Sequence, residues 1–347
     1  MVAPRQLPTQ LLAVQQEWQP LEPTNGTVDS ALPAPDHSAG AELALLRATA
    51  EQERFCRTHP IKHPATAFLN IPHQPDKNSS GGTLFKLMPS LRSHVLGGES
   101  LVVSEPYHMY VYAKADILSD QIAASGSWEA DMTAQMVHKL ALFAEAKGLA
   151  RDEVYMVDIG ANVGAHTMAM AAHGFNVLAF EPLHANIQGL RYSLCLNRQL
   201  QGRITLIPKS AMIEKFKGRV GVLKIDVEGN EHSVLEGAVN FFKTVRPPYV
   251  TAECSDLMMI RASNKPASEF FRKMHNLGYE VHQDSFDGPV IPDAMFDSWQ
   301  EPSIRNYWFT LSETTAPSAM LETAAGIFTM TGASALTETA ADKTSQE

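Results

Sequence analysis

The first residues that could do chemistry lie in a glycine turn, Asp158-Ile-Gly-Ala-Asn-Val-Gly164, which follows a short apolar run. Glycine has no Cβ, so such a turn lets the backbone approach a ligand closely and aims helix N–H groups at it. Asp158 could hold an ammonium group of the ligand or order the loop, and Asn162 tolerates the left-handed backbone of tight turns. The spacing Gly160-x-x-x-Gly164 differs from the G-x-G-x-x-G of dinucleotide folds. The turn therefore indicates a nucleotide-type ligand other than NAD.

A second acidic residue, Glu181, ends the next apolar run, in Ala179-Phe-Glu-Pro182. A carboxylate can accept two O–H bonds, and nucleotide-binding α/β folds use one at this place to hold ribose hydroxyls. Glu181 follows Asp158 by 23 positions, close to the spacing of about 20 typical of these folds. A strand-end carboxylate in water is the alternative, but the glycine turn upstream favours ribose binding.

The third cluster is Leu223-Lys-Ile-Asp-Val-Glu-Gly-Asn-Glu231. Asp226 and Glu228 are two residues apart, so an extended chain places them on one face, and Lys224 shares that parity. Charged side chains at the end of a buried strand cost free energy unless they pair with opposite charges or serve a function such as ligand binding or catalysis. We therefore expect a functional role, with a lysine–carboxylate pair that orders the loop as the alternative. A divalent metal on the two carboxylates stays open, but the sequence shows no third ligand, so no metal site is assigned.

Alternating strand and helix patterns position these clusters. Repeated βα units imply a mainly parallel sheet with helices on both faces, and ligands bind beyond the carboxyl ends of its strands. Strands are expected at 154–159, 177–180, 204–207, 220–227, 249–254, 279–282 and 307–311. A helix is expected between the first two strands, ending at residue 173, and further helices are expected at 185–197, 231–243 and 267–277. Upstream, we expect helices at 41–56 and 131–147, strands at 101–103 and 109–113, and a turn at 126–129.

Composition divides the chain into four parts. Residues 1–40, rich in Pro, Gln, Thr and Ser, are expected to be a disordered lead, and residues 312–347, dominated by Thr, Ala, Ser and Glu, a disordered tail. Between them, residues 41–150 should form an N-terminal helical and strand extension, and residues 151–311 the main α/β domain.

Bulk composition excludes several classes of protein. A formal net charge of −10 argues against general nucleic-acid binding, which needs a basic face. The sequence shows neither a signal-peptide-length apolar run nor a membrane span. Three widely spaced cysteines do not suggest a disulfide framework or a zinc site, and Cys195 and Cys254 are expected to be small buried apolar groups. The expected location is the cytoplasm, with organellar targeting left open.

Three motifs in order, Asp158 to Gly164, Ala179 to Pro182 and Lys224 to Gly229, resemble the FkbM family of S-adenosylmethionine-dependent methyltransferases. Gly126-Ser-Trp-Glu129 resembles an upstream element of that family, so the resemblance covers about residues 100–311. It implies a class I methyltransferase (Rossmann-like) fold: a doubly wound, mostly parallel sheet with an antiparallel last strand, here with an N-terminal α+β extension. It also implies that the glycine turn lies under the methionine part of the cofactor and that Glu181 binds the ribose. The cofactor-binding residues expected on this basis are Glu129, Asp158, Gly160, Asn162, Gly164 and Glu181.

The resemblance implies O-methylation of a hydroxyl on a sugar or natural-product-like acceptor, either a small molecule or a glycan. An alcohol needs a base near the transition state, and we expect Asp226 to be the first candidate and Glu228 the second. Only 41 residues lie between Pro182 and Lys224, fewer than the resemblance leads us to expect. Just eight of them, residues 212–219, separate Ala211 from Val220, whereas a parallel crossover usually needs a dozen or more. The third crossover helix is therefore expected to be short or missing, which would open the adenine side of the pocket.

Two other functions stay open from the sequence alone. The first is a non-catalytic methyltransferase-like scaffold or regulatory binding protein, which the short crossover and the long flexible ends favour. The second is an NAD-dependent oxidoreductase, which the missing G-x-G-x-x-G disfavours. The identity of the methyl acceptor does not follow from the fold.

Overall fold

The structure is a computed structural model that describes residues 37–61, 68–72, 82–97, 100–114, 116–207, 216–301 and 303–312. Its helices and strands all belong to one unit, Met1–Leu311, and Ser312–Glu347 is a second unit. The predicted lead and tail lie almost wholly outside the described residues, except that helix α2 begins at His37. The short crossover predicted between Pro182 and Lys224 also falls largely outside them, at residues 208–215. The four domain boundaries stay predictions.

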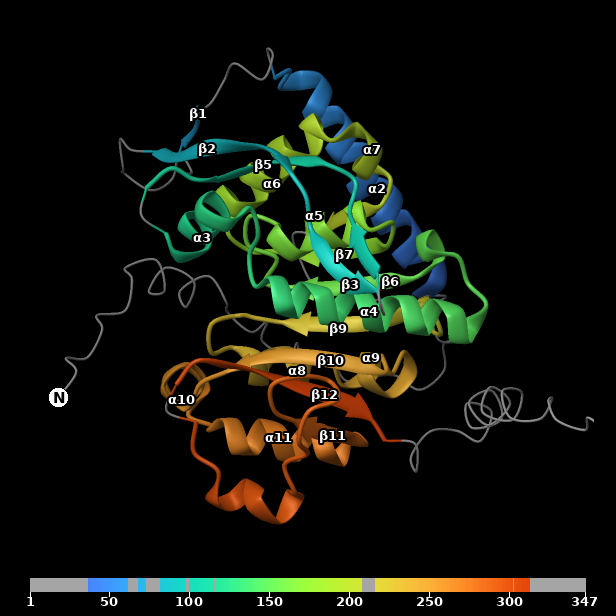
Figure 1. Cartoon of the computed structure of the whole chain (residues 1–347), viewed down its shortest axis with the longest axis vertical. Helices are drawn as coiled ribbons and strands as arrows, with labels where there is room; N and C mark the ends of the chain where they lie inside the picture. The colour runs from blue at the N-terminus through green and yellow to red at the C-terminus, as the bar shows by residue number, and fades with distance from the viewer. Residues whose placement is uncertain are drawn as a thin grey trace, which may run out of the picture. The chain divides into compact units, whose positions relative to one another are not determined.

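A seven-stranded sheet forms the centre of the first unit, in the order β11–β12–β10–β9–β6–β7–β8 (Figure 1). Neighbours from β10 to β8 are parallel, and β12 is antiparallel to both β10 and β11. This is the class I methyltransferase arrangement with an antiparallel last strand, so the predicted fold is confirmed. The strands are β6 (Tyr155–Ile159), β7 (Asn176–Phe180), β8 (Ile204–Ile207), β9 (Val220–Ile225), β10 (Tyr249–Cys254), β11 (Tyr279–His282) and β12 (Arg305–Leu311).

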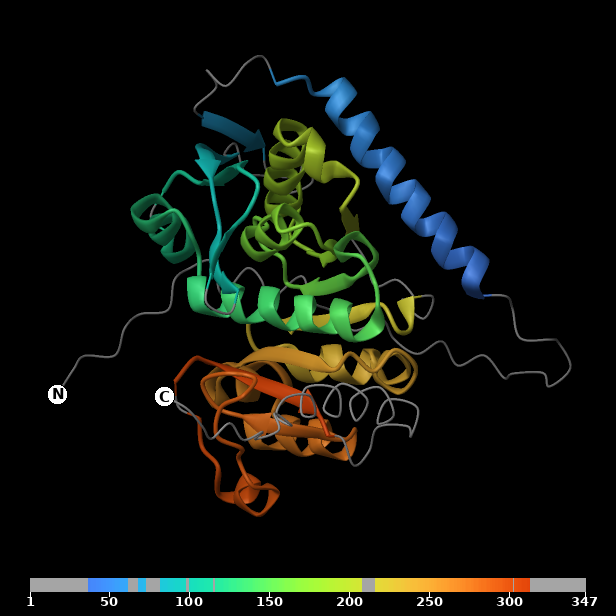
Figure 2. The same cartoon turned by 45° about the vertical axis from the view of Figure 1, so that its right-hand side comes forward.

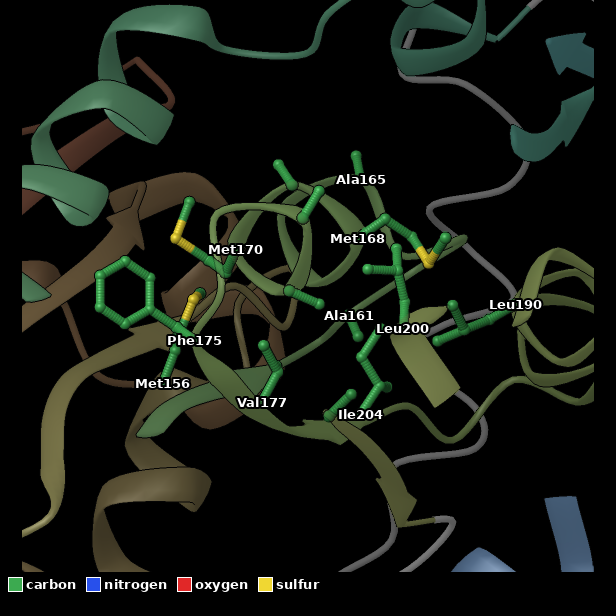
Figure 3. Close-up of a cluster of buried hydrophobic side chains, with 14 of the residues drawn as sticks. Met156, Ala161, Ala165, Met168, Met170, Phe175, Val177, Leu190, Leu200 and Ile204 are labelled. Carbon is green, nitrogen blue, oxygen red and sulfur yellow. The ribbon is translucent and has the colours of Figure 1, made fainter. Parts of the chain in front are cut away.

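Helices cover both faces of this sheet, because its strands are apolar on both sides. Met156 belongs to one buried cluster and its neighbour Val157 to another, and Val222 and Leu223 divide in the same way. Figure 3 shows the first cluster, where side chains of α5 meet those of β6, β7 and β8. That face packs against α4 (Ala130–Lys147), α5 (Ala165–Ala172), α6 (His184–Leu196) and α7 (Arg198–Gln201). The other packs against α8 (Glu231–Gly237), α9 (Val239–Thr244), α10 (Asp256–Ser263) and α11 (Ala267–Asn276).

The N-terminal extension adds a small antiparallel sheet in the order β1–β2–β5 and a separate hairpin, β3–β4. Its long helix α2 packs along α6 and β8 (Figure 2). The elements are α2 (His37–Thr58), β1 (Phe68–Pro72), β2 (Gly82–Leu91), β3 (His94–Gly97), β4 (Ser100–Val103), β5 (Tyr107–Tyr112) and α3 (Ile117–Ser125). The α+β extension expected from the sequence is therefore present.

The cysteine prediction is half wrong. Cys56 of α2 and Cys195 of α6 form a disulfide, with their Cα atoms 5.3 Å apart. The two residues are separated by 139 positions, and only the packing of α2 on α6 brings them together, so the sequence carries no local sign of the pair. Cys254 is a buried free thiol, as expected. Among the described residues, no helix has the length and apolar character needed to cross a membrane.

Candidate functional site

The predicted motifs meet at the carboxyl ends of neighbouring strands, because β6 lies between β7 and β9 in the sheet. The loop after β6 touches both neighbours. The backbone N–H of Asn162 donates to Glu181 Oε2 beyond β7, at 2.8 Å. On the other side, the backbone N–H of Asp226 donates to the carbonyl of Ile159, at 2.9 Å. The sequence prediction that the three motifs form one site is therefore consistent with the fold.

The glycine turn is required by the chain's own packing as well as by any ligand. Gly160 has a φ of 84°, and a Cβ there would lie 1.7 Å from the carbonyl oxygen of Asp226. Gly164 has a φ of 92°, and a Cβ there would lie 2.5 Å from Leu190 Cδ1. Asn162 has a φ of 53°, which is the left-handed backbone expected for it. The turn can therefore pass tightly between β7 and β9 only with glycine at 160.

Glu181 is 5 % exposed and joins the turn to the start of α6. Its Oε2 accepts from the backbone of Asn162, and its Oε1 accepts from Leu183 N at 2.7 Å. Burial raises the pKa of Glu181 to about 7, even though these backbone bonds favour the charged form. The side chain of Asn186 also hydrogen-bonds this carboxylate. A carboxylate has about four acceptor sites, so Glu181 keeps capacity for a further bond, such as one from a ribose hydroxyl.

Asp158 lies below the turn and is only 1 % exposed. Thr167 Oγ1 donates to its Oδ2 at 2.6 Å, and its Oδ1 lies 3.7 Å from Lys224 Nζ. Asp158 is therefore joined to α5 and to β9, on either side of its own strand. Lys224 in turn donates to Asp226 Oδ2 at 3.0 Å. Burial alone would lower the pKa of Lys224, but the charges of Asp226 and Asp158 outweigh it and raise the pKa, so the side chain stays an ammonium.

Three carboxylates converge beyond β9 and β10. Oxygens of Asp226, Glu228 and Glu253 all lie within 4.8 Å of one another. Burial raises the pKa of Glu228 to about 8, and the charges of Asp226 and Glu231 add to this. Burial and the same neighbouring carboxylates also raise the pKa of Glu253. Three carboxylates this close share protons or a cation, because like charges oppose ionisation.

Glu253 was missed from the sequence, although a signal existed. It lies near the end of β10, the strand next to β9, so its side chain could be expected beside the third motif. It is the third oxygen ligand that a divalent cation on Asp226 and Glu228 would have needed.

Glu129 stands at the other side of Lys224, as the N-cap residue of α4, with a φ of 40°. Its Oε1 accepts from Asn306 Nδ2 at 3.0 Å, and its Oε2 lies 3.1 Å from His166 Nε2. Burial alone would raise the pKa of Glu129, but the hydrogen bond and charge of His166, with the charge of Lys224, lower it. Sequence reasoning found Glu129 but neither His166 nor Asn306.

A cavity of about 690 Å³ opens beside Glu129, between α3, α4, β12 and the loop after β11. Its wall offers carboxylates, amides and one guanidinium, so it can exchange many hydrogen bonds with a hydroxyl-rich molecule. Trp308 in this wall is 3 % exposed and packs in the core, so it offers no open stacking surface. The polar side chains around the cavity are Gln121, Glu129, Asp131, Gln135, Asp284, Arg305 and Asn306.

Comparison with known families identifies part of the chain. Residues 201–281 match the model described as the Methyltransferase FkbM domain. The matched stretch runs from the end of α7 to β11 and contains the motif Lys224 to Gly229 as well as Glu253. The resemblance to this methyltransferase family is therefore confirmed, and the family implies S-adenosylmethionine as the cofactor. No curated protein matches the chain.

Solved structures with some similarity include several methyltransferases. The bifunctional kinase-methyltransferase WbdD has a TM-score of 0.38 at 11 % identity, over 55 % of this chain and 41 % of its own. The METTL16 MTase domain has a TM-score of 0.33 at 11 % identity, over 52 % and 68 %. Precorrin-6y C5,15-methyltransferase from Geobacter metallireducens GS-15 has a TM-score of 0.31 at 14 % identity, over 53 % and 91 %. Similarities this weak carry no argument about the substrate of this chain.

Proposed function

We propose that this chain, whose residues 201–281 match the Methyltransferase FkbM domain, is an S-adenosylmethionine-dependent O-methyltransferase that acts on a hydroxyl of a sugar or natural-product-like acceptor. The observation that carries the proposal is the junction of the glycine turn with Glu181, where the backbone N–H of Asn162 donates to the carboxylate at 2.8 Å. This junction puts a tight turn and a diol-accepting acid side by side, as an adenosyl cofactor requires.

The residues present fit such a cofactor in charge and shape. S-adenosylmethionine carries an ammonium and a sulfonium, and the charges of His166 and Lys224 keep Glu129 ionised. His166 lies at the start of α5, the helix that directly follows the glycine turn. Glu181 keeps acceptor capacity for the ribose hydroxyls, and the backbone at Gly160 has no room for a side chain. The proposed cofactor-binding set is Glu129, Asp158, Gly160, Asn162, Gly164 and Glu181.

When bound, the cofactor would supply an activated methyl group, so the chain must align the acceptor oxygen, exclude water and take up a proton. Such alignment can contribute several kcal/mol, up to about 7–11 in favourable cases. A positioned base contributes about 10²–10⁴-fold. Asp226 is the first candidate, because Lys224 orients its carboxylate at 3.0 Å. Glu228 is the second, because its pKa of about 8 lies near the pH at which a base works best.

The cavity beside Glu129 is the proposed place for the acceptor. It borders both Glu129 and Asn306, which hydrogen-bond each other at 3.0 Å, so it reaches the edge of the cofactor site. Its amide and carboxylate lining suits the hydroxyls of a sugar or a small natural product.

Calorimetric titration of the purified protein with S-adenosylmethionine tests the proposal. We expect the wild type to bind, Glu181→Ala to abolish binding, and Asp226→Asn to keep binding but lose turnover. Thermal unfolding of each variant serves as the folding control. A wild type that folds but does not bind would reject the enzyme and favour the scaffold or regulatory alternative. Full turnover by Asp226→Asn would instead remove only that residue from the role of base.

A further inference from the structure

We propose that His166 is a positioning residue that holds the Glu129 carboxylate in place for the cofactor, an inference that rests on the proposed function. His166 is the second residue of α5, and its side chain is 4 % exposed. Its Nε2 lies 3.1 Å from Glu129 Oε2, and its Nδ1 lies 3.1 Å from Thr133 Oγ1. Both ring nitrogens therefore have a partner on or next to α4.

The partners determine which ring nitrogen faces Glu129 as a donor. An ionised carboxylate can only accept, so Nε2 must carry a proton. In the neutral ring Nδ1 accepts from the Thr133 hydroxyl. In the charged ring Nδ1 donates to that hydroxyl, which can turn to the carbonyl of Trp128 at 3.4 Å. The bond to Glu129 is therefore kept in both protonation states of the imidazole.

Glu129 is a residue that needs to be held. Its φ of 40° is rare for a residue with a side chain, and its carboxylate makes no cap bond to α4. Its side chain is 26 % exposed at the wall of the cavity. A free glutamate there would sample several rotamers, and cofactor binding would have to order it. Asn306 fixes one oxygen and His166 the other, so the carboxylate is ordered in advance.

The hydrogen bonds of its ring distinguish His166 from the other buried histidine at this helix. Every residue of α5 is buried, and a buried imidazole is costly unless its nitrogens are paired. His173, the residue that caps the other end of α5, shows the contrast: it is 5 % exposed and neither of its ring nitrogens has a hydrogen-bond partner. The pairing of His166 with Glu129 distinguishes the two histidines and makes a matched control available.

Two conservative variants separate positioning from packing. Glutamine at 166 keeps an amide donor near the place of Nε2, whereas asparagine keeps one near Nδ1 and loses the donor to Glu129. We expect His166→Asn to weaken S-adenosylmethionine binding about tenfold, which is the order expected for one hydrogen bond to a charged group. We expect His166→Gln to stay within about threefold of the wild type, and His173→Asn to leave the affinity unchanged.

A double-mutant cycle with Glu129→Ala completes the test by calorimetric titration. If His166 acts through Glu129, His166→Asn changes the affinity less than twofold in that background. An equal loss in both backgrounds, or equal affinities for the asparagine and glutamine variants, would overturn the inference while leaving the proposed function intact. A folded wild type that binds no S-adenosylmethionine would reject the proposed function itself, and this inference with it.

Discussion

Breaking the disulfide between Cys56 and Cys195 should lower the stability of the unit Met1–Leu311. The bond joins residues 139 positions apart, and the chain-entropy relation for a loop of that length gives about 5 kcal/mol at 25 °C. Unfolding entropy is about 2.1 cal/mol/K per residue, or about 0.65 kcal/mol/K over this unit. The full loss would therefore lower the melting temperature by about 8 °C.

The other contacts of α2 keep the helix in place when the bond is open, so the expected effect falls mainly on the unfolded chain. Gln52 Nε2 donates to the carbonyl of Arg191 at 3.0 Å, and the ring of Phe55 packs edge-on against Tyr192 at 5.0 Å. Arg191 also pairs with Glu51. Because these contacts survive reduction, the reduced protein should remain folded, with about 8 °C as the upper limit of its loss.

Thermal unfolding with and without a thiol reductant measures the effect. We expect the reductant to lower the melting temperature of the wild type, and to have no effect on the double variant Cys56→Ser, Cys195→Ser, which should melt with the reduced wild type. Thiol titration of the denatured, unreduced protein should find one free thiol, that of Cys254. Three thiols in protein purified without reductant, or a melting temperature that reduction leaves unchanged, would refute the reasoning.

The same titration bears on where the protein works. Disulfides persist in oxidising compartments and are rare in the cytosol, so the bond between Cys56 and Cys195 counts against the cytoplasmic location expected from the sequence. One free thiol in protein taken from its native source would contradict that expectation, whereas three would support it.

Two further predictions concern the site. Gly160→Ala should fail to fold or lose several kcal/mol, because its Cβ would lie 1.7 Å from the carbonyl of Asp226, whereas Gly202→Ala, with open space around it, should melt like the wild type. In thermal unfolding, Glu228→Gln should lose less stability than the wild type as the pH rises from 6 to 9. The pKa of Glu228 in the folded wild type is raised to about 8, so the stability that comes from the proton on this side chain is lost as the pH rises through that value. If the melting temperatures of the two proteins changed with pH by the same amount, the result would contradict the raised pKa of Glu228.

The strands of the large sheet could be predicted because each is a short apolar run that ends at a polar or turn-forming residue. All seven strands lie where the sequence indicated, and β8, β10 and β11 begin and end at the predicted residues. Short helices were harder to predict, since one or two turns contain too few residues to show the hydrophobic periodicity of a helix. Helices α3, α7 and α10 were not predicted, and the expected helix at 231–243 is two helices, Glu231–Gly237 and Val239–Thr244.

The residues of the candidate site also fall into two groups, those that the sequence could predict and those that it could not. Asp158, Glu181 and Asp226 could be found because each lies near the carboxyl end of a strand or directly after it, and parallel strands end at one edge of the sheet. His166 and Asn306 could not be found, because their role in the site depends on their contacts with Glu129, which lies 37 and 177 positions away along the chain. Contacts at such separations depend on how α4 packs against α5 and on the register of β12, and neither follows from a local pattern.

Those distant contacts show that the N-terminal extension is part of the proposed site. Glu129 comes from before residue 150, yet both of its hydrogen-bond donors, His166 and Asn306, come from after it. The hydroxyl of Tyr112 in β5 likewise donates to Asn186 of α6. Helix α4, which directly follows Glu129, packs on β9 and α5 (Figure 1). A carboxylate fixed from both sides in this way can meet a cationic ligand without being ordered by it. The two predicted parts, 41–150 and 151–311, therefore both contribute side chains to the proposed cofactor site, although the family match covers only residues 201–281.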